Sequence, residues 1–311
     1  MGGKIYMNEV IVDRGLIWTI RDISDLGKFR ITIMVCITSL AGFLAYNGTV
    51  SVELIYCLAG MFFLSSGSAA LNQIQERHYD AIMPRTSSRP LPAGRLSLNQ
   101  AVWISLIMSL TGISLLAFGV GTTVLMLGLL TYFWYNVIYT YLKKLTAYAV
   151  IPGSVIGALP PVIGYVSAGG YLFDRSAWIL ALVYFCWQVP HYFLLVLKYG
   201  KEYELAGFPS LSNFQTDHKI RMQVFAWVIL TALLTIYMAF TSLSVSYITT
   251  GGLILSAAWL VWLFSSLATT QEVRKKPIWY FMRINYFILA VSVLLVFDKT
   301  IFFFIQNLVM N

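Results

Sequence analysis

The stretch LNQIQERHYDAIMPRTSSRPLPAG, residues 71–94, gathers charged, amide and proline residues between two long apolar runs. Asn72, Glu76 and Asp80 follow one another at four-residue intervals, so a helix that continues through Asp80 would present all three on one face. Pro84 cannot continue that helix, which leaves Arg85 and Arg89 on the irregular segment beyond it. The sequence therefore predicts an acidic helix face beside a loop that carries two arginines.

These side chains suit a magnesium ion that carries a phosphate-rich ligand. Mg2+ is held by one or two carboxylates together with substrate phosphates. Guanidinium groups bind phosphate oxygens through paired hydrogen bonds. A plainer interpretation is also open, because charged connectors between hydrophobic helices are ordinary in membrane proteins and can report topology alone.

The composition is that of a membrane protein. The chain has 311 residues, of which 59% are hydrophobic and 11% charged, and its mean hydropathy is +0.75. A soluble protein of this length carries roughly twice that charged fraction. Apolar runs of about 20 residues, the length that crosses a bilayer, recur from end to end. We expect an all-α, polytopic membrane protein that forms one domain over residues 1–311.

Nine membrane-spanning helices are expected, preceded by an amphipathic segment at residues 1–28 that lies at the cytoplasmic interface. The expected spans are 30–46, 52–72, 99–118, 122–141, 148–168, 177–197, 222–242, 247–269 and 279–297. A short apolar tail, 299–311, follows the last of them.

Lysine and arginine give the orientation of these spans. All except Arg175 and Lys299 fall in the N-terminal segment, in the connections 73–98, 142–147, 198–221 and 270–278, or at adjoining span ends. The positive-inside rule places these segments, and the N-terminus, in the cytoplasm. The net charge of +8 is therefore a topology signal, and no nucleic-acid partner is expected.

A second polar stretch, WQVPHYFLLVLKYGKEYELAGFPSL at residues 187–211, resembles the first in its layout. His191, Lys198 and Glu202 share one helix face, and a Gly-Pro break follows. Both stretches follow even-numbered spans, so their loops would face each other across a ring of helices. His191 lies inside an apolar span, where it is either a hydrogen-bonded packing residue or a ligand for a metal or cofactor.

Two further segments carry polar or small residues. Asn136, Tyr139 and Lys143 share a face in YNVIYTYLKKLT, residues 135–146, which is either a second phosphate contact or an interfacial aromatic belt followed by topology lysines. The small residues and Pro160-Pro161 in GSVIGALPPVIGY, residues 153–165, predict that the fifth span is broken and thinned. The glycines there either permit close helix packing or shape a bent wall for a bulky ligand.

At these residues the chain resembles the intramembrane prenyltransferases of the UbiA type and, within them, the protoheme IX farnesyltransferase (heme O synthase) family. The first family signature, N-x-x-x-D-x-x-x-D-x-x-M-x-R-T-x-x-R-P, is matched by Asn72, Glu76, Asp80, Met83, Arg85, Thr86, Arg89 and Pro90. Further similar elements are Leu26, Lys28, Arg30, Ile31 and Thr32 before the first span; Tyr139, Thr140, Leu142 and Lys143; Gly157, Ala158, Pro160, Pro161, Ile163 and Gly164; Trp187, Pro190, His191 and Tyr192; Tyr203, Ala206, Gly207 and Pro209; and Phe281, Arg283, Tyr286 and Asp298. The resemblance spans residues 26–298.

The chain departs from the family pattern at several positions. Glu76 and Glu202 stand where the family usually has aspartate, which keeps the charge and lengthens each arm by one methylene. Lys201 stands where an acid is common, and residues 212–220 do not follow the pattern. These departures concern the identity of the acceptor more than the type of reaction.

The resemblance implies a ring of nine helices around a central cavity, in a bacterial or archaeal plasma membrane. It implies transfer of a farnesyl group from farnesyl diphosphate to a vinyl group of heme B, giving heme O, with Mg2+ as cofactor. It assigns the metal to Asn72, Glu76, Asp80 and Glu202, the diphosphate to Arg85, Arg89, Lys143 and Lys198, and the acceptor to His191 and Tyr139. Membrane lipid and a protein of the heme A pathway are the further partners it implies.

Two other functions remain open at this point. The same chemistry could prenylate an aromatic or quinone-precursor acceptor. Alternatively, the chain could be a heme-handling membrane transporter, since such proteins also contain broken helices and paired charges. A transport pathway places its binding groups near the midplane of the membrane, whereas the ionisable residues here gather at one face.

Overall fold

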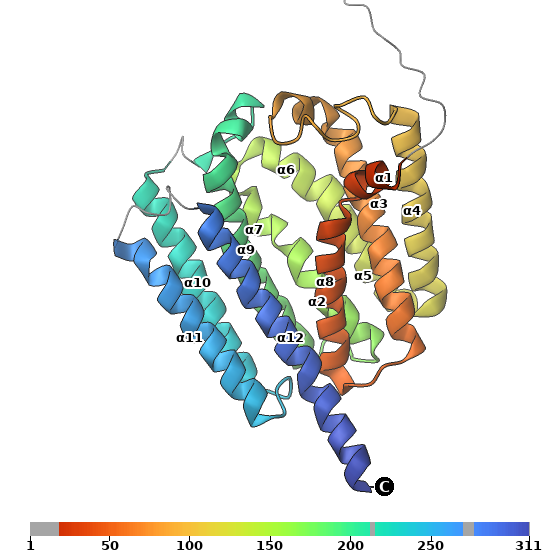
Figure 1. Cartoon of the computed structure of the whole chain (residues 1–311), viewed down its shortest axis with the longest axis vertical. Coiled ribbons are helices and arrows are strands. Elements are labelled where there is room, and N and C mark those ends of the chain that lie inside the picture. Colours follow the sequence, from red (N-terminus) through yellow and green to blue (C-terminus); the bar gives the residue numbers. More distant parts are fainter. Residues whose placement is uncertain (1–18, 212–214, 270–276, 311) are drawn as a thin grey trace, which may run out of the picture.

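The computed structural model describes residues 19–211, 215–269 and 277–310, with side chains left out at 217, 268–269 and 302–310. All its regular elements in these ranges are helices. They are α1 (Ile20–Leu26), α2 (Phe29–Asn47), α3 (Val52–Ile82), α4 (Leu98–Gly119), α5 (Thr122–Phe133), the π-helix η1 (Trp134–Tyr139), α6 (Thr140–Leu145), the 3-10 turn η2 (Ala147–Ala149), α7 (Val150–Gly153), α8 (Val155–Ser167), α9 (Arg175–Leu205), α10 (Asp217–Ala239), α11 (Tyr247–Thr269) and α12 (Pro277–Met310). Figure 1 shows the long helices running side by side.

Nine helical segments in the described ranges are long and apolar enough to cross a membrane, and the nine expected spans are thereby confirmed. The second and sixth continue past their expected ends, because α3 runs to Ile82 and α9 to Leu205. The extension of α3 carries polar residues of the stretch 71–94, and the extension of α9 carries polar residues of the stretch 187–211. The last helix also differs from expectation, since α12 continues to Met310 where a separate tail was expected. Of the amphipathic segment 1–28, residues 1–18 lie outside the described residues, and 20–26 form α1.

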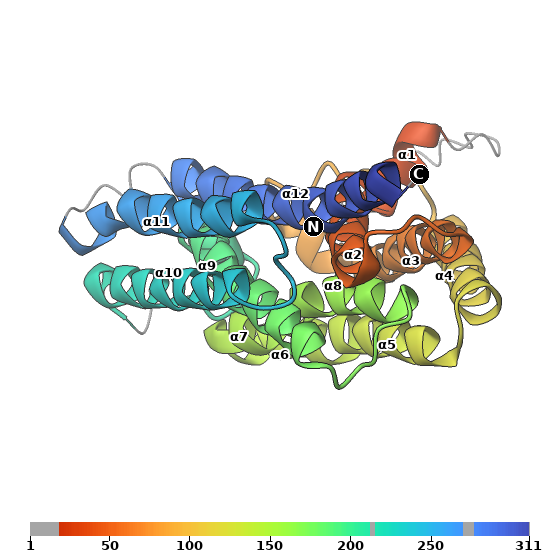
Figure 2. The ribbon, with the colours of Figure 1, turned by 90° about the horizontal axis from the view of Figure 1, so that it is seen from below.

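The helices follow one another around a closed ring. α9 packs against α8 and α10, α11 lies between α10 and α12, and α12 closes the ring against α2. Figure 2 shows α12 running along one side of the bundle from α11 to α2. α3 packs on both α2 and α4, and α8 lies against α2 and α9, so α8 and α9 bring the second polar stretch toward the first.

The contact between α2 and α8 depends on two glycines. A Cβ added to Gly42 would lie 1.8 Å from the carbonyl oxygen of Pro161, and one added to Gly164 would lie 1.8 Å from the carbonyl oxygen of Ser39. Side chains at either position would push the helices apart, so close packing is the role of Gly164. The break expected within residues 153–165 is present, but the prolines do not make it. Both prolines lie inside α8, and the interruption of the span falls earlier, at Ser154 between α7 and α8.

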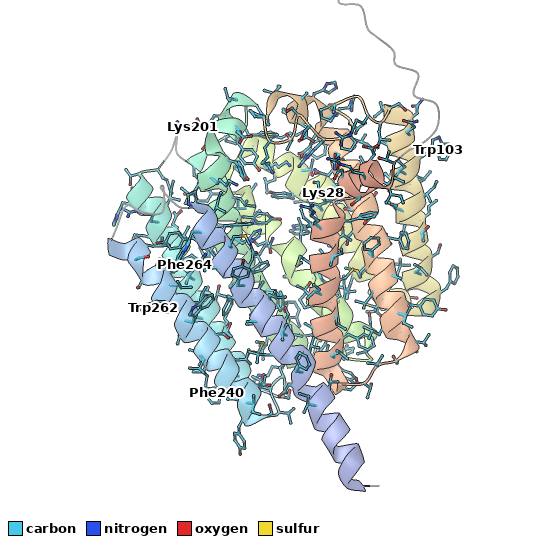
Figure 3. The ribbon with its side chains drawn as sticks, viewed as in Figure 1. Lys28, Trp103, Lys201, Phe240, Trp262 and Phe264 are labelled. Carbon is cyan, nitrogen blue, oxygen red and sulfur yellow. The ribbon has the colours of Figure 1, made fainter. Side chains whose placement is uncertain are left out.

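The two ends of the bundle differ in charge. The connections that follow α3, α6 and α9 lie together at the upper end of Figure 1, whereas those that follow α2, α4, α8 and α10 lie at the opposite end. Figure 3 places Lys28 and Lys201 at the charged end and Phe240 at the other. The outer surface is apolar: Trp103 is 60% exposed and Trp262 71% exposed, and both face outward. This is an integral membrane protein whose ionisable residues gather at one end.

Candidate active site at the charged end of the bundle

The acidic face of α3 is built as its spacing predicts. Asn72, Glu76 and Asp80 are 1%, 5% and 1% exposed, so all three point into the bundle. The helix ends at Met83, whose backbone is extended and whose N–H still bonds to the carbonyl of Tyr79. Pro84 explains why the helix ends here, because the residue before a proline avoids the helical conformation.

Both carboxylates on this face are paired with cations. Nη1 of Arg89 donates to both oxygens of Asp80 at 2.7 Å. Nζ of Lys143, on α6, forms an ion pair with Oε1 of Glu76. A buried carboxylate without a partner is costly, so these pairs let the acids stay charged inside the bundle. The structure thus brings together two of the predicted acids with two of the predicted cations.

Lys28 completes this group, although its role was not predicted from the sequence. Its Nζ donates to Oδ1 of Asn72 at 2.9 Å and to the hydroxyl of Tyr135 at 3.2 Å. The same Tyr135 hydroxyl donates to Asn72 Oδ1 at 3.0 Å, and Asn72 Nδ2 donates to Oγ1 of Thr140 at 3.1 Å. The signal was available, because Lys28 belongs to the motif that precedes the first span.

Lys28 has unusual local properties. It is the N-cap of α2 and has a left-handed backbone with φ of 50°, which costs free energy for a side chain other than glycine. Burial, together with the nearby charge of Arg89, lowers the pKa of Lys28 to about 7. A lysine held in this way is a second candidate, beside Lys143, for contacting a phosphate.

The loops of the two polar stretches meet, as expected. Oε2 of Glu202 accepts a hydrogen bond of 3.1 Å from the backbone N–H of Arg85. Met83, Ala206 and Phe208 form a small buried cluster between the loops. This contact joins the end of α9 to the segment that follows α3.

Arg85 and Lys198 lie at the edge of the site. The guanidinium of Arg85 stands 4.5 Å from the centre of the Tyr199 ring, and Nζ of Lys198 stands 4.2 Å from the same centre. Lys198 is exposed and also donates to the Tyr199 hydroxyl. Neither side chain is paired with the buried acids of α3, so the structure places the two predicted diphosphate residues beside the acidic face and not on it.

Each predicted oxygen ligand of the metal thus meets a nitrogen donor. The pairs are Asn72 with Lys28, Glu76 with Lys143, Asp80 with Arg89, and Glu202 with the N–H of Arg85. Within the described ranges, no three acidic, histidine or cysteine side chains converge to hold a metal ion. The donor set fits Mg2+ in its chemistry, since it consists of carboxylate and amide oxygens. A metal ion at these oxygens would compete with the nitrogen donors that hold them in this structure.

Aromatic rings border these charged groups. Tyr139 stacks between Tyr135 and Tyr192, with ring centres 6.0 and 5.8 Å apart, and Nζ of Lys143 stands 5.5 Å from the Tyr139 centre. The ring of His191 lies 5.6 Å from that of Tyr192. We call Tyr135, Tyr139 and Tyr192 the aromatic row. A hollow opens beside it, lined by Tyr139, Lys143, Thr146, Ala147, Ala149, Val150, Val196, Tyr203, Phe208 and Pro209.

The π-helix η1 explains how two tyrosines of the row reach the site. π-turns inside α-helices are rare and often occur at functional sites, because they turn side chains that a regular helix would leave elsewhere. Asn136, on η1, is fixed by bonds from its Nδ2 to Oγ of Ser68 at 2.6 Å and to the carbonyl of Tyr132 at 3.0 Å. The sequence showed the polar residues of this segment but gave no signal for the change of helix type.

His191 lies apart from the charged groups. Its Nδ1 is 2.9 Å from Oδ1 of Asn285 on α12, and its ring packs against those of Trp187 and Phe281. Trp187 in turn donates to the carbonyl of Ile284 at 2.7 Å. α12 therefore supplies the hydrogen-bond partner of His191 and one of the rings packed against it, which the position of His191 on α9 did not reveal.

Comparison with known proteins agrees with this arrangement. The profile of the UbiA prenyltransferase family matches residues 34–289. The chain is 31% identical over 288 residues to a protoheme IX farnesyltransferase of Oleidesulfovibrio alaskensis, covering 91% of this chain and 98% of that protein. It is 40% identical over 187 residues to one of Geobacter sulfurreducens, covering 60% of this chain and 69% of that protein.

Solved structures show the same fold. A structure of digeranylgeranylglyceryl phosphate synthase superposes with a TM-score of 0.74 at 15% identity, covering 90% of this chain and 98% of that one. A UbiA homologue from Archaeoglobus fulgidus, bound to GPP and Mg2+, superposes with a TM-score of 0.61 at 14% identity, covering 87% and 99%. With its ring of helices and its match over most of its length, the chain belongs to the UbiA prenyltransferase family.

Proposed function

We propose that this protein transfers a farnesyl group from farnesyl diphosphate to a vinyl group of heme B, giving heme O. The observation that carries the proposal is the meeting of Asn72, Glu76 and Asp80 with Lys28, Lys143 and Arg89 at one end of an apolar bundle. Relatives named protoheme IX farnesyltransferase support the acceptor, and the neighbour bound to GPP and Mg2+ supports the donor class. One membrane domain carries the reaction.

The cations of the site promote ionisation of the allylic diphosphate. Breaking the C–O bond leaves both electrons on the diphosphate, and the charges of Lys28, Lys143 and Arg89 stabilise that growing negative charge. Mg2+, held by Asn72, Glu76, Asp80 and Glu202, supplies further neutralisation of the phosphate oxygens when bound. Arg85 and Lys198 lie at the edge, where they attract the anionic substrate.

The aromatic row serves the second half of the reaction. The farnesyl cation forms a C–C bond with the vinyl group, and water then adds a hydroxyl to the resulting cation and releases a proton. Premature attack by water on the farnesyl cation would waste the donor, so the site has to stay dry until the C–C bond forms. Tyr135, Tyr139 and Tyr192 provide apolar ring faces between the charged groups and His191.

The site faces the cytoplasm in this proposal. The connections at the charged end hold the lysines and arginines that the positive-inside rule assigns to that side, and α1, the first described helix, lies there as well. The protein would lie in a bacterial or archaeal plasma membrane, take both amphipathic substrates from the membrane, and pass its product to a protein of the heme A pathway.

The reaction can be tested with purified protein in lipid nanodiscs. We expect farnesyl diphosphate, heme B and Mg2+ together to give diphosphate and a farnesylated heme detectable by mass spectrometry, with no product after EDTA. Product from an aromatic or quinone-precursor acceptor and none from heme would assign the second prenylation chemistry. Tight heme binding with no diphosphate release under any condition would favour a heme-handling protein and would overturn the proposal.

A further inference from the structure

The hydrogen bonds of Asn285 fix which nitrogen of His191 carries the proton. Nδ2 of Asn285 donates to the carbonyl of Phe281 at 2.8 Å, so the amide oxygen is the atom that faces the imidazole. That oxygen lies 2.9 Å from Nδ1 of His191 and can only accept, so Nδ1 is the donor. The neutral imidazole then has an unprotonated Nε2 with a free lone pair.

This arrangement is the one that protein histidines adopt when they bind a metal. A ligating histidine donates its other ring N–H to a carboxylate, carbonyl or water, and this bond fixes both its tautomer and its orientation. Among the described residues, Nε2 of His191 has no hydrogen-bond partner, and the residue is partly exposed. Trp187 and Phe281 hold the ring from its sides.

The imidazole is also in the right place relative to the rest of the site. It contacts Tyr192, the last ring of the aromatic row, and that row leads through Tyr139 to Tyr135, which bonds to Asn72 and Lys28. A planar macrocycle that lies along the row would have its metal near His191 and one edge toward the charged groups. The other two histidines, His78 on α3 and His218 on α10, are exposed.

We infer that Asn285 is a positioning residue that holds His191 with Nε2 free, and that Nε2 binds the iron of the heme acceptor. The bond is a simple coordination of a neutral imidazole to iron, without any redox step. This inference rests on the proposed function, because it takes the acceptor to be heme. It adds a role for α12, which presents Asn285 and Phe281 to the acceptor half of the site.

The test uses the full-length protein in nanodiscs, loaded with heme B alone. We expect an iron–histidine stretching band in the resonance Raman spectrum of the ferrous complex, absent in His191→Gly and restored by added imidazole. His78→Gln and His218→Gln are matched controls that should keep the band.

Asn285 variants then test the positioning role. Asn285→Leu removes the hydrogen bond at similar size, and we expect a lower band frequency and a heme affinity weaker by about 10- to 100-fold. Asn285→Asp accepts the same proton with a charged oxygen, so the band should move to higher frequency. In turnover, the KM for heme should rise in Asn285→Leu while the KM for farnesyl diphosphate stays constant.

The outcomes separate this inference from the proposed function. Suppose that the wild-type protein farnesylates heme but the band is unchanged in His191→Gly or in both Asn285 variants. This result would overturn the inference and leave the proposed reaction standing. Failure of wild-type protein to farnesylate heme, with or without the band, would instead overturn the proposed function. If the Asn285→Leu protein unfolds, Asn285→Asp takes its place in the test. A merely structural role of Asn285 would not produce the shift to higher frequency expected for Asn285→Asp.

Discussion

The Nζ of Lys28 lies 2.9 Å from Oδ1 of Asn72, so a cation occupies an oxygen that the sequence assigns to a metal ion. The Glu76–Lys143 and Asp80–Arg89 pairs repeat this relationship on the same helix face. The site without substrate is therefore neutralised by its own side chains. Binding of a metal diphosphate would exchange partners, because the cations can turn to the phosphates as the oxygens turn to the metal.

Lys28 makes the binding of diphosphate dependent on pH. Its pKa of about 7 lies below the usual 10.5 because burial disfavours the ammonium form. The ammonium is present below that pKa and lost above it, so affinity for a non-ionising farnesyl thiodiphosphate should fall as the pH rises through about 7. Calorimetric titration from about pH 6 to about pH 9 would measure this fall. Lys28→Arg stays charged throughout and is the control for titration of the ligand. If the affinity of Lys28→Arg and of the wild type changed with pH in the same way, the prediction would be contradicted.

Asp80→Asn should abolish turnover and leave the fold intact. The amide keeps an oxygen for Arg89 but loses the charge that a metal requires. Loss of an outer partner of a metal site costs about 10- to 100-fold, so loss of a direct ligand should cost more than about 100-fold in kcat. Asp25→Asn makes the same change at a partly exposed acid paired with Arg95, and it should leave kcat unaltered. Turnover of Asp80→Asn near the wild-type rate would exclude Asp80 as a ligand.

Substitutions in the Glu76–Lys143 pair should change stability and activity independently. Lys143→Met leaves a buried carboxylate without its counter-charge and should lower the free energy of unfolding by about 3–5 kcal/mol. Adding Glu76→Gln removes that charge, so the double variant should regain most of the lost stability. It should remain inactive, since both the metal ligand and the phosphate cation are gone. Unfolding in mixed micelles and product assays on the same preparations measure the two effects, and additive losses of stability would argue against the pair.

Gly42→Ala should disrupt the contact that sets the position of α8 against α2. The new methyl group would lie 1.8 Å from the carbonyl oxygen of Pro161, which is backbone and cannot turn away. Overpacking of this kind costs about 1–3 kcal/mol or more, measured as a lower Tm. Gly251→Ala is the matched control, because a Cβ there meets nothing within 4 Å. It should be neutral or stabilise α11 by up to about 1 kcal/mol. Equal Tm values for Gly42→Ala and wild type would disprove the close contact.

Much of the site could be predicted because its pattern is local. The four-residue spacing of Asn72, Glu76 and Asp80 fixes their common face once the helix forms, and Pro84 fixes where the helix ends. The meeting of the two polar loops followed from their equivalent places after even-numbered spans. The prediction failed at Pro160 and Pro161, which α8 accommodates without a break. Neighbouring membrane helices can satisfy the backbone groups that proline frees, so a proline pair is weak evidence for a break in a membrane.

The sequence by itself determined the number of spans, the charged end and the acidic face, because the length of an apolar run and the period of a helix are properties of neighbouring residues. Only the tertiary structure decided which partners meet: Lys28 with Asn72, Lys143 with Glu76, and Asn285 with His191. These pairs join separate helices, and their alignment depends on how closely the backbones approach, as at Gly42 and Gly164. That approach is a property of the packed bundle, since it is set by all the contacts of each helix at once.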